Sequence, residues 1–487
     1  MKLLQDILFR SRIQEVIGST NVAVEHITMD SRNVKPFSLF IAVNGVSVNG
    51  HDFIAKAIEN GARAIVCEVL PEVPITDVTI VRVSDSSEAL GHIASNYYDN
   101  PSEKINVIAV TGTNGKTTTA TLLYMLARKM GHKSGLISTV ENKINDKIIP
   151  STHTTPDAIS LNKLLSEMAK EACEYCFMEA SSHALHQGRL TGVLIKGALF
   201  TNITHDHLDY HGTFNDYIKA KKMLFDFLPS TSFAIVNHDD KHSDVMLQNC
   251  KARKKTMALQ SMADYKAKVL ENSFSGLHLM IDNHDLYSQL IGGFNAYNIL
   301  AVYATAMELG MDRFDVLTAL SSLKAPEGRF QYIKTNSGIT AVVDYAQTPD
   351  ALKNVLKTIK DIRTGNEKVI TLVGCGGDRD KTKRPEMARI AASLSDRIVL
   401  TSDNPRSENP DTIIAEMKEG LDPVMMKKTL AITERREAIK LACTLAQPGD
   451  ILLIAGKGHE KYQEIAGVKH PFDDFEIVSE TLKTLDK

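Results

Sequence analysis

The stretch GTNGKTT, which begins at Gly112, carries the residue types that bind phosphate. Gly112 and Gly115 allow a tight turn, so that successive backbone N–H groups can face an anion. Lys116 can neutralise phosphate oxygens, and the hydroxyl of Thr117 can bind Mg²⁺. The loop is shorter than the usual Walker pattern, whose first glycine would fall at Val110. A glycine-rich turn with a solvated lysine is the alternative interpretation.

The elements around this loop favour the phosphate interpretation. The apolar run 105–110 predicts a strand, and the run 118–130 predicts a helix. A strand, a glycine loop and a helix in this order are what a phosphate loop requires, because the helix adds its positive N-terminal end. The pattern therefore indicates a nucleoside triphosphate, but it does not identify the reaction.

Alternation of strand and helix patterns continues along the chain and divides it into three units. We expect an α/β protein with three domains: a small N-terminal α/β domain over 1–100, a central P-loop ATPase-like domain with a parallel sheet over 101–331, and a C-terminal Rossmann-like α/β domain over 332–487. The run 99–104 is typical of a linker. The chain shows no internal repeats.

Composition excludes several classes of protein. The chain has 487 residues, of which 43% are hydrophobic and 24% are charged, and its net charge is −3. This charge does not favour nucleic acid or a membrane surface as a partner. No apolar run can span a bilayer, so we expect a cytoplasmic protein without stable membrane insertion. Cys173 and Cys176 form a C-x-x-C without a second pair, which favours a buried structural role over a metal site.

Two further stretches, 177–189 and 201–225, place chemistry-bearing residues after apolar strands. Glu179 follows a strand, His207 lies in the sequence DHLD, and Lys221 lies on the next predicted helix. Together with the shortened phosphate loop, these stretches resemble the Mur ligase family, which also includes folylpolyglutamate synthases. The resemblance covers essentially the whole chain and implies an ATP-dependent, amide-forming ligase.

The resemblance implies ATP and Mg²⁺ as cofactors. It matches Thr117, Glu179, His207 and a carbamylated Lys221 to the family's magnesium site. The residue types alone do not choose His207, since Mg²⁺ prefers oxygen ligands, and they do not choose Lys221 among the neighbouring lysines. A neutral lysine amine that captures CO₂ becomes an anion able to hold Mg²⁺.

The resemblance also assigns ATP binding and catalysis. The matched ATP-binding residues are Gly112, Thr113, Asn114, Gly115, Lys116, Thr117, Thr118, Asn295, Arg329 and Asp344. The matched catalytic residues are Lys116, Lys221, His207 and Arg329. The chain departs from the family at Gln347, where a histidine is usual, so no role is assigned to that position.

The best match within the family is the ligase that extends UDP-N-acetylmuramoyl-L-alanyl-D-glutamate by its third amino acid. The N-terminal domain is then the UDP-binding domain. The matched contacts to this substrate are Met29, Ser31, Val46, Ser47, Val48, His153, Thr154, Thr155, Ser181, Gln187 and Arg189. A guanidinium at Arg189 suits a substrate that carries carboxylates, although a surface salt bridge is the simpler interpretation.

The third amino acid is usually meso-2,6-diaminopimelate or L-lysine, and the sequence DNPR at 403–406 resembles the diaminopimelate version. Diaminopimelate carries an additional carboxylate at its far end, which Arg406 and Arg379 can pair with, while Glu460 can bind its ammonium. Lysine would leave Arg406 desolvated and unpaired. The matched positions are Arg379, Asp403, Asn404, Pro405, Arg406, Gly456 and Glu460.

Several alternatives remain. The same ligation with L-lysine, or a sister ligase with another acceptor, is the nearest. A folylpolyglutamate synthase would leave the N-terminal domain and DNPR unexplained. A nucleotide-driven switch, a kinase and a binding module without catalysis belong to other classes. The sequence GKGHE at 456–460 resembles a second phosphate loop, but no Ser or Thr follows its lysine. We expect a monomer whose partners are UDP-N-acetylmuramoyl-L-alanyl-D-glutamate and meso-diaminopimelate.

Overall fold

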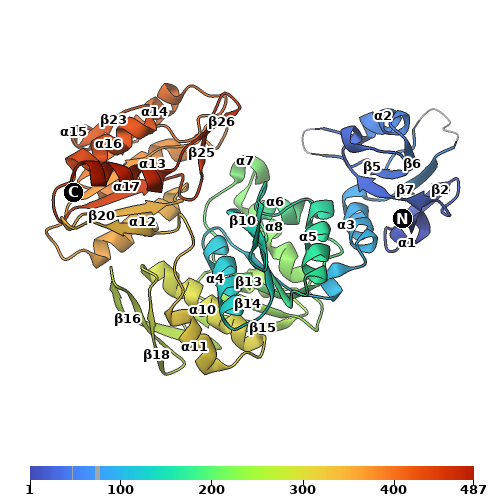
Figure 1. The fold of residues 1–487 in the computed structure, drawn as a ribbon, viewed down its shortest axis with the longest axis horizontal. Helices are drawn as coiled ribbons and strands as arrows, with labels where there is room; N and C mark the ends of the chain where they lie inside the picture. The colour runs from blue at the N-terminus through green and yellow to red at the C-terminus, as the bar shows by residue number, and fades with distance from the viewer. Residues whose placement is uncertain (46–47, 72–76) are drawn as a thin grey trace.

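The chain folds into three α/β units, each built on its own sheet (Figure 1). The computed structural model describes residues 1–45, 48–71 and 77–487. The central unit lies between the other two, and the two chain termini lie in the two outer units (Figure 1). No helix in the described ranges is long and apolar enough to cross a membrane. The α/β fold class predicted from the alternating pattern is confirmed.

The N-terminal unit contains a five-stranded sheet in the order β2-β7-β6-β5-β4. β4 to β7 are parallel, and β2 pairs antiparallel with β7 at one edge. The strands are β2 (Ile13–Ile17), β4 (His26–Thr28), β5 (Ser38–Ile41), β6 (Ala62–Cys67) and β7 (Thr79–Val83), with a small pair β1 (Lys2–Leu3) and β3 (Ala23–Val24). The helices are α1 (Leu4–Ile7), α2 (Ile54–Glu59) and α3 (Ser86–Tyr97).

The central unit contains an eleven-stranded mixed sheet in the order β11-β10-β9-β12-β8-β13-β14-β15-β16-β17-β18. The strands from β9 to β16 in this order are parallel, and hairpins add antiparallel strands at both edges. The strands are β8 (Asn106–Thr111), β9 (Ser134–Ile137), β10 (Glu141–Ile144), β11 (Lys147–Pro150), β12 (Tyr175–Glu179), β13 (Ile195–Phe200), β14 (Phe233–Asn237), β15 (Arg253–Ala258), β16 (Tyr265–Ser273), β17 (Gly276–Ile281) and β18 (His284–Ser288). The parallel centre was predicted, whereas the antiparallel edges were not.

Helices cover both faces of the middle of the central sheet, which explains why inner strands such as β12 and β14 are buried along their whole length. Alternate residues of β8 enter different cores: Ile108 and Val110 belong to one cluster, and Val107 and Ala109 belong to the other. The helices are α4 (Lys116–Lys129), α5 (Ala158–Lys170), α6 (Ser182–His186), α7 (Leu208–His211), α8 (Phe214–Asp226), α9 (Ser243–Leu247), α10 (Gly293–Glu308) and α11 (Arg313–Ser321). α4 begins at the phosphate loop, as the sequence predicts.

The C-terminal unit contains a six-stranded sheet in the order β19-β20-β24-β21-β22-β23, parallel except for β19. The strands are β19 (Gln331–Lys334), β20 (Thr340–Asp344), β21 (Val369–Val373), β22 (Arg397–Leu400), β23 (Thr429–Ala431) and β24 (Ile451–Ala455), with a separate hairpin β25 (Tyr462–Ile465) and β26 (Val468–Pro471). The helices are α12 (Pro349–Ile362), α13 (Lys383–Leu394), α14 (Pro410–Lys418), α15 (Pro423–Lys427), α16 (Arg435–Leu445) and α17 (Asp474–Thr484).

Short one-turn 3₁₀ helices join some of these elements. They are η1 (Ser31–Asn33), η2 (Gly50–Phe53) and η3 (Pro101–Glu103). η3 lies in the run predicted as the linker between the first two units. The domain bounds at 100/101 and 331/332 stay predictions, and the second of them falls on the first residue of β19.

Candidate active site

The phosphate loop needs both of its glycines. Gly112 and Gly115 have φ values of +150° and +87°, which other residues rarely adopt. A Cβ at Gly112 would lie 1.9 Å from Thr201 Oγ1, and one at Gly115 would lie 2.5 Å from Asn298 Oδ1. The loop follows the carboxyl end of β8, the edge at which open α/β sheets bind ligands. Local sterics therefore explain the glycine spacing.

Lys116 is folded back on the loop that carries it. Its Nζ donates to the carbonyl of Gly112 at 2.9 Å and to the carbonyl of Thr113 at 2.8 Å. Burial lowers the pKa of this ammonium, and the carboxylates of Glu179 and Asp206 partly oppose that shift. The cation thus has neutral acceptors only, which phosphate oxygens can replace.

Thr117 and Glu179 form an oxygen-rich pair below the loop. Thr117 Oγ1 donates to Glu179 Oε2 at 3.0 Å, and the Glu179 side chain is fully buried at the end of β12. Arg329 lies shortly before β19, the first strand of the third unit, and its Nη2 donates to Thr117 Oγ1 at 2.9 Å. A hydroxyl and a carboxylate at this edge are donors that Mg²⁺ prefers, so this part of the predicted magnesium site fits the ion.

His207 and Lys221 lie in the same region but do not contact Glu179 in this arrangement. His207 Nε2 lies 3.4 Å from Asp206 Oδ2, and Lys221 Nζ donates to the carbonyl of Gly112 at 2.7 Å. Within the described ranges, no three His, Cys, Asp or Glu side chains are gathered tightly enough to bind a metal. Burial lowers the pKa of His207 and lowers the pKa of Lys221 well below its usual value, with Lys116 adding to the second shift. Both shifts are toward the neutral forms of the side chains.

A cavity of about 440 Å³ opens between the second and third units beside the phosphate loop. Its lining includes Asn114, Gly115 and Thr118 of the loop, together with Arg329 and Asp344. Its other lining residues include Thr201, Asn202, Thr204, Asp239, Tyr297, Asn298, Tyr345 and Asp350. A nucleotide at the phosphate loop would occupy this space.

Asn295 does not line this cavity. It is buried on α10, where its Oδ1 accepts a hydrogen bond from Asn298 Nδ2 at 2.9 Å. Asn298, one helical turn later, lines the cavity, and the predicted role of Asn295 stays a prediction. The i, i+3 spacing in NAYN was the available signal for Asn298.

Asp350 was not predicted from the sequence, although it contacts the phosphate loop. It lies on α12 of the third unit, and its Oδ2 accepts hydrogen bonds from Asn114 Nδ2 at 2.8 Å and from Thr204 Oγ1 at 3.3 Å. Asp350 therefore links the third unit directly to the phosphate loop. No motif in the sequence pointed to this link, because it joins residues that are 236 positions apart.

Asp344 ends β20, and its Oδ2 accepts a hydrogen bond from the backbone N–H of Phe330 at 2.7 Å. Burial raises the pKa of this carboxyl to about 6, against a smaller opposing effect of Arg329. The Arg329 guanidinium also lies over the ring of Tyr345, at 4.7 Å from its centroid. Gln347 Nε2 donates to the carbonyl of Gly456 at 3.3 Å, which gives this unusual position a contact in the third unit.

Four of the residues matched to the muramoyl-peptide converge beside β12. Arg189 Nη1 donates to the carbonyl of Thr155 at 2.7 Å, and its Nε and Nη2 donate to Gln187 Oε1 at 3.0 and 2.7 Å. Ser181 Oγ accepts a hydrogen bond from Thr155 Oγ1 at 3.3 Å. Arg189 has neutral partners in these contacts, which suits an arginine that binds a substrate carboxylate.

The other matched substrate residues are more dispersed. Thr154 lies near this cluster and accepts a hydrogen bond from Thr139 Oγ1 at 3.0 Å, and His153 is exposed. In the first unit, Met29 and Val48 are exposed, and Ser31 is buried in η1. Val46 and Ser47 lie outside the described residues. The residues of the set that lie beside β12 are thus close together, whereas Met29, Ser31 and Val48 lie in the first unit.

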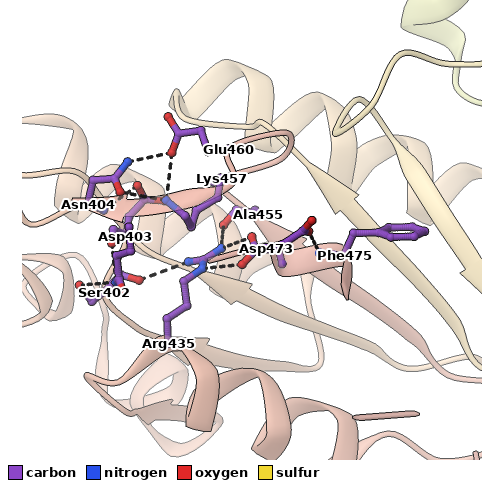
Figure 2. A network of polar contacts seen from close by, with 12 residues as sticks. Ser402, Asp403, Asn404, Arg435, Ala455, Lys457, Glu460, Asp473 and Phe475 are labelled. Atoms are coloured by element: carbon purple, nitrogen blue, oxygen red, sulfur yellow. Dashed lines mark hydrogen bonds and ion pairs between the residues drawn. The ribbon is translucent and has the colours of Figure 1, made fainter. Parts of the chain in front are cut away.

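The loops of the third unit that carry DNPR and GKGHE meet at one end of its sheet, as Figure 2 shows. Asp403 and Asn404 follow β22, and Gly456 follows β24, its neighbour but one in the sheet. A Cβ at Gly456 would lie 2.5 Å from Asp403 Oδ2, so only glycine fits there. Asn404 Nδ2 donates to Glu460 Oε2 at 2.8 Å.

The side chains of Arg406 and Arg379 both approach Gly376. A Cβ at Gly376 would lie 2.9 Å from Arg406 Nη1 and 3.8 Å from Arg379 Cγ. Arg406 Nη1 donates to the carbonyl of Gly377 at 2.6 Å, and its Nε lies 3.8 Å from Glu464 Oε2. The backbone of Pro405 lies equally close to Gly377: a Cβ at Gly377 would lie 1.9 Å from the carbonyl oxygen of Pro405. Both predicted arginine side chains thus approach Gly376, and the DNPR segment that carries Arg406 binds Glu460 through Asn404.

Three family models match the chain. They are the "Mur ligase family, catalytic domain" over residues 23–98, the "Mur ligase middle domain" over 110–306 and the "Mur ligase, glutamate ligase domain" over 328–458. Each match falls in one of the three α/β units. Together they cover more than half of the chain.

Curated relatives match over almost the full length. A UDP-N-acetylmuramoyl-L-alanyl-D-glutamate--2,6-diaminopimelate ligase from Cytophaga hutchinsonii is 57% identical over 485 residues, which cover 99% of this chain and 100% of the relative. A ligase of the same name from Phocaeicola vulgatus is 51% identical and covers 98% of each chain.

A solved structure with the same ligase name superposes with a TM-score of 0.71 at 35% identity and covers 100% of this chain and 99% of its own. The structure of MurF from Thermotoga maritima with ADP shares the fold at a TM-score of 0.62 and 20% identity, covering 95% of this chain and 97% of its own. The predicted family resemblance is confirmed, and the chain belongs to the Mur ligase family.

Proposed function

We propose that the protein ligates meso-2,6-diaminopimelate to UDP-N-acetylmuramoyl-L-alanyl-D-glutamate with hydrolysis of ATP, in cytoplasmic synthesis of peptidoglycan precursors. The choice of amino acid rests on two observations: Arg379 and Arg406 both approach Gly376, and Asn404 of the same DNPR segment binds Glu460 at 2.8 Å. Two cations and a carboxylate match a substrate end that carries one carboxylate and one ammonium. The printed names of the full-length relatives support the same assignment.

The reaction divides into two steps. The γ-carboxylate of the D-glutamyl residue attacks the γ-phosphorus of ATP, which gives an acyl phosphate and ADP. The amine of diaminopimelate then attacks the acyl carbon, and the tetrahedral intermediate loses phosphate to give the amide. Lys116 and Arg329 stabilise the negative charge that moves over the phosphoryl oxygens in the first step.

Thr117, Glu179, His207 and carbamylated Lys221 would hold Mg²⁺, which supplies positive charge at the phosphates when it is bound. The chain itself prepares this site in two ways. Glu179 presents its carboxylate to Thr117 from the end of β12. Lys221 is buried against the carbonyl of Gly112, in surroundings that favour the neutral amine needed to capture CO₂.

Substrate positioning requires the three units to act together. Arg189 and Gln187 orient a substrate carboxylate on the second unit, and the loops after β22 and β24 orient the amino acid on the third. Asp350 and Arg329 contact Asn114 and Thr117 of the phosphate loop. A nucleotide that binds to this loop would therefore also affect the position of the third unit. Close contact between these units excludes water, which protects the acyl phosphate from hydrolysis.

The test is a coupled assay of ADP release by the purified protein with ATP, Mg²⁺, the UDP-dipeptide and one amino acid. We expect release with diaminopimelate, together with a UDP-tripeptide product of the corresponding mass. If ADP is released with L-lysine and not with diaminopimelate, the amino-acid substrate is lysine and the proposed choice is wrong. Release without either amino acid would favour a nucleotide-driven switch, and no release in any mixture would contradict the ligase.

A further inference from the structure

A fully buried lysine lies beneath the amino-acid loops and has no role in the reaction described so far. Lys457, labelled in Figure 2, follows β24 in the sequence GKGHE. Its side chain has no solvent-exposed surface. Its Nζ donates to Asn404 Oδ1 at 2.9 Å and to Glu460 Oε2 at 3.0 Å. Burial of an ammonium is costly unless its partners compensate it, so these two contacts are the reason it is tolerated there.

Lys457, Asn404 and Glu460 form a closed triangle of hydrogen bonds. Asn404 Nδ2 donates to the same Glu460 Oε2 at 2.8 Å, and Asn404 Oδ1 also accepts from the backbone N–H of Glu464 at 2.9 Å. The orientation of the Asn404 amide is therefore fixed by donors on one side and an acceptor on the other. One oxygen of Glu460 is held by two donors, which leaves the carboxylate a single orientation.

The charges around this triangle do not balance. Within the network, Asp403, Glu460 and Asp474 supply three carboxylates, whereas Arg435 and Lys457 supply two cations. Arg406 and Glu464, next to the network, have opposite charges 3.8 Å apart and balance each other. Arg435 is committed to Asp474, which it binds through Nε at 2.9 Å and Nη2 at 2.7 Å. Lys457 thus compensates one of the two remaining carboxylates. Asp403 Oδ2 is buried and has no hydrogen-bond partner in the described part of the chain.

We propose that Lys457 is a positioning residue for the amino-acid substrate: it fixes Glu460 and Asn404 and compensates one of two pocket carboxylates, so that the pocket accepts a single ammonium group. The proposal rests on the proposed function, because it presumes an amino acid with a distal ammonium in this pocket. Lys457 acts through Glu460 and does not itself contact the substrate. The network has one more carboxylate than cations, so the substrate group that completes it carries one positive charge.

The proposal has a consequence for pH dependence. Burial and Asp403 raise the pKa of Glu460, and Lys457 opposes that shift. The other groups that face Glu460 are Asn404, Arg435 and Tyr345. Without Lys457 the pKa of Glu460 would rise further, so Glu460 would be protonated at a higher pH. Binding of an ammonium would then weaken as the pH falls, and this weakening would begin at a higher pH than in the wild type.

The experiment compares the KM for diaminopimelate in the wild type, K457M and the control K428M. Lys428 is a matched control because its Nζ donates to the Ser395 carbonyl before the amino end of β22, whereas Asn404 follows the carboxyl end of that strand. We expect K457M to raise this KM about tenfold, with a larger factor at lower pH, and to leave the KM values for ATP and the UDP-dipeptide unchanged. K428M should change none of them.

A double-mutant cycle separates positioning from a merely structural role. If Lys457 acts through Glu460, K457M should raise the KM less than about twofold in an E460Q background. Equal factors in both backgrounds, or a K457M variant with unchanged KM and pH profile, would overturn the proposal. If K457M is too unstable to assay, K457Q keeps an amide donor and allows the same cycle, with the same outcomes deciding. A wild type that does not use diaminopimelate would contradict the proposed function itself.

Discussion

The phosphate loop and the amino-acid pocket treat a buried cation in opposite ways. Lys116 donates only to backbone carbonyls of its own loop, whereas Lys457 and Arg435 are bound by side-chain carboxylates. Lys116 has no carboxylate bound to its ammonium, and the phosphate groups of a nucleotide can supply that negative charge. The other two already have their countercharges and hold the surrounding loops in place. The comparison teaches that burial of a charge does not by itself reveal its role, because the partners decide it.

The first prediction tests the phosphate loop, where we expect the largest effect. K116M should lower kcat by about 10²–10³-fold, because the charge that stabilises the transferring phosphoryl group is lost. The same change should leave the thermal midpoint unchanged or raise it, since burial lowers the pKa of Lys116 and the charged form is unfavourable there. ADP release and a thermal melt measure the two effects.

K129M, on the exposed C-terminal end of the same helix, is the matched control and should retain activity. A K116M variant that keeps its turnover, or that loses turnover only because it unfolds, would contradict the comparison.

The second prediction removes a cation from the other region. R435M should lower the free energy of unfolding by about 3–5 kcal/mol, because Asp474 would be left buried without its partner. Arg435 also donates to the carbonyls of Ser402 and Ala455, so it ties the ends of β22 and β24 together. Urea unfolding measures the loss. The exposed neighbour variant R436M should lose little, and equal stability of R435M and R436M would refute the structural role of Arg435.

The third prediction concerns Asp344 and is smaller. Burial raises its pKa to about 6 from an ordinary value of 3.8, so between these values the carboxyl is protonated when folded and ionised when unfolded. Its contribution to stability is therefore present below the lower value and is lost as the pH rises to about 6. D344N keeps an acceptor for the Phe330 N–H and should lack this loss.

Urea unfolding at several pH values between 4 and 7 checks this prediction. The difference in unfolding free energy between D344N and the wild type should shift in favour of D344N as the pH rises. Parallel profiles for the two proteins would show that Asp344 titrates normally.

Much of the fold could be predicted from the sequence, because regular elements leave periodic signals. The strand predicted at 105–110 corresponds to β8. The helix predicted at 118–130 corresponds to α4, which begins at Lys116 and ends at Lys129. The strands β16 to β18 were missed because β16 and β18 carry many polar residues and lack a continuous apolar run. Family resemblance supplied most candidate site residues, and periodicity alone would not have selected them.

The polar network of Figure 2 could not be predicted in the same way. Sequence patterns treat lysine and arginine as exposed, yet Lys457 and Arg435 are among the most buried side chains of the described chain. Their partners are far away in sequence, so no local spacing links them. The sequence GKGHE attracted attention only as an incomplete phosphate loop, and its lysine instead binds Asn404 and Glu460.

The choice of amino acid is the central claim, and one ratio tests it most directly. We would measure kcat/KM for diaminopimelate and for L-lysine in the wild type and in R406A, with R397A at the exposed start of β22 as the control. We expect the wild type and R397A to prefer diaminopimelate, and R406A to lose about 10²-fold of that preference because the distal carboxylate is left without its guanidinium. An unchanged preference in R406A would contradict the account.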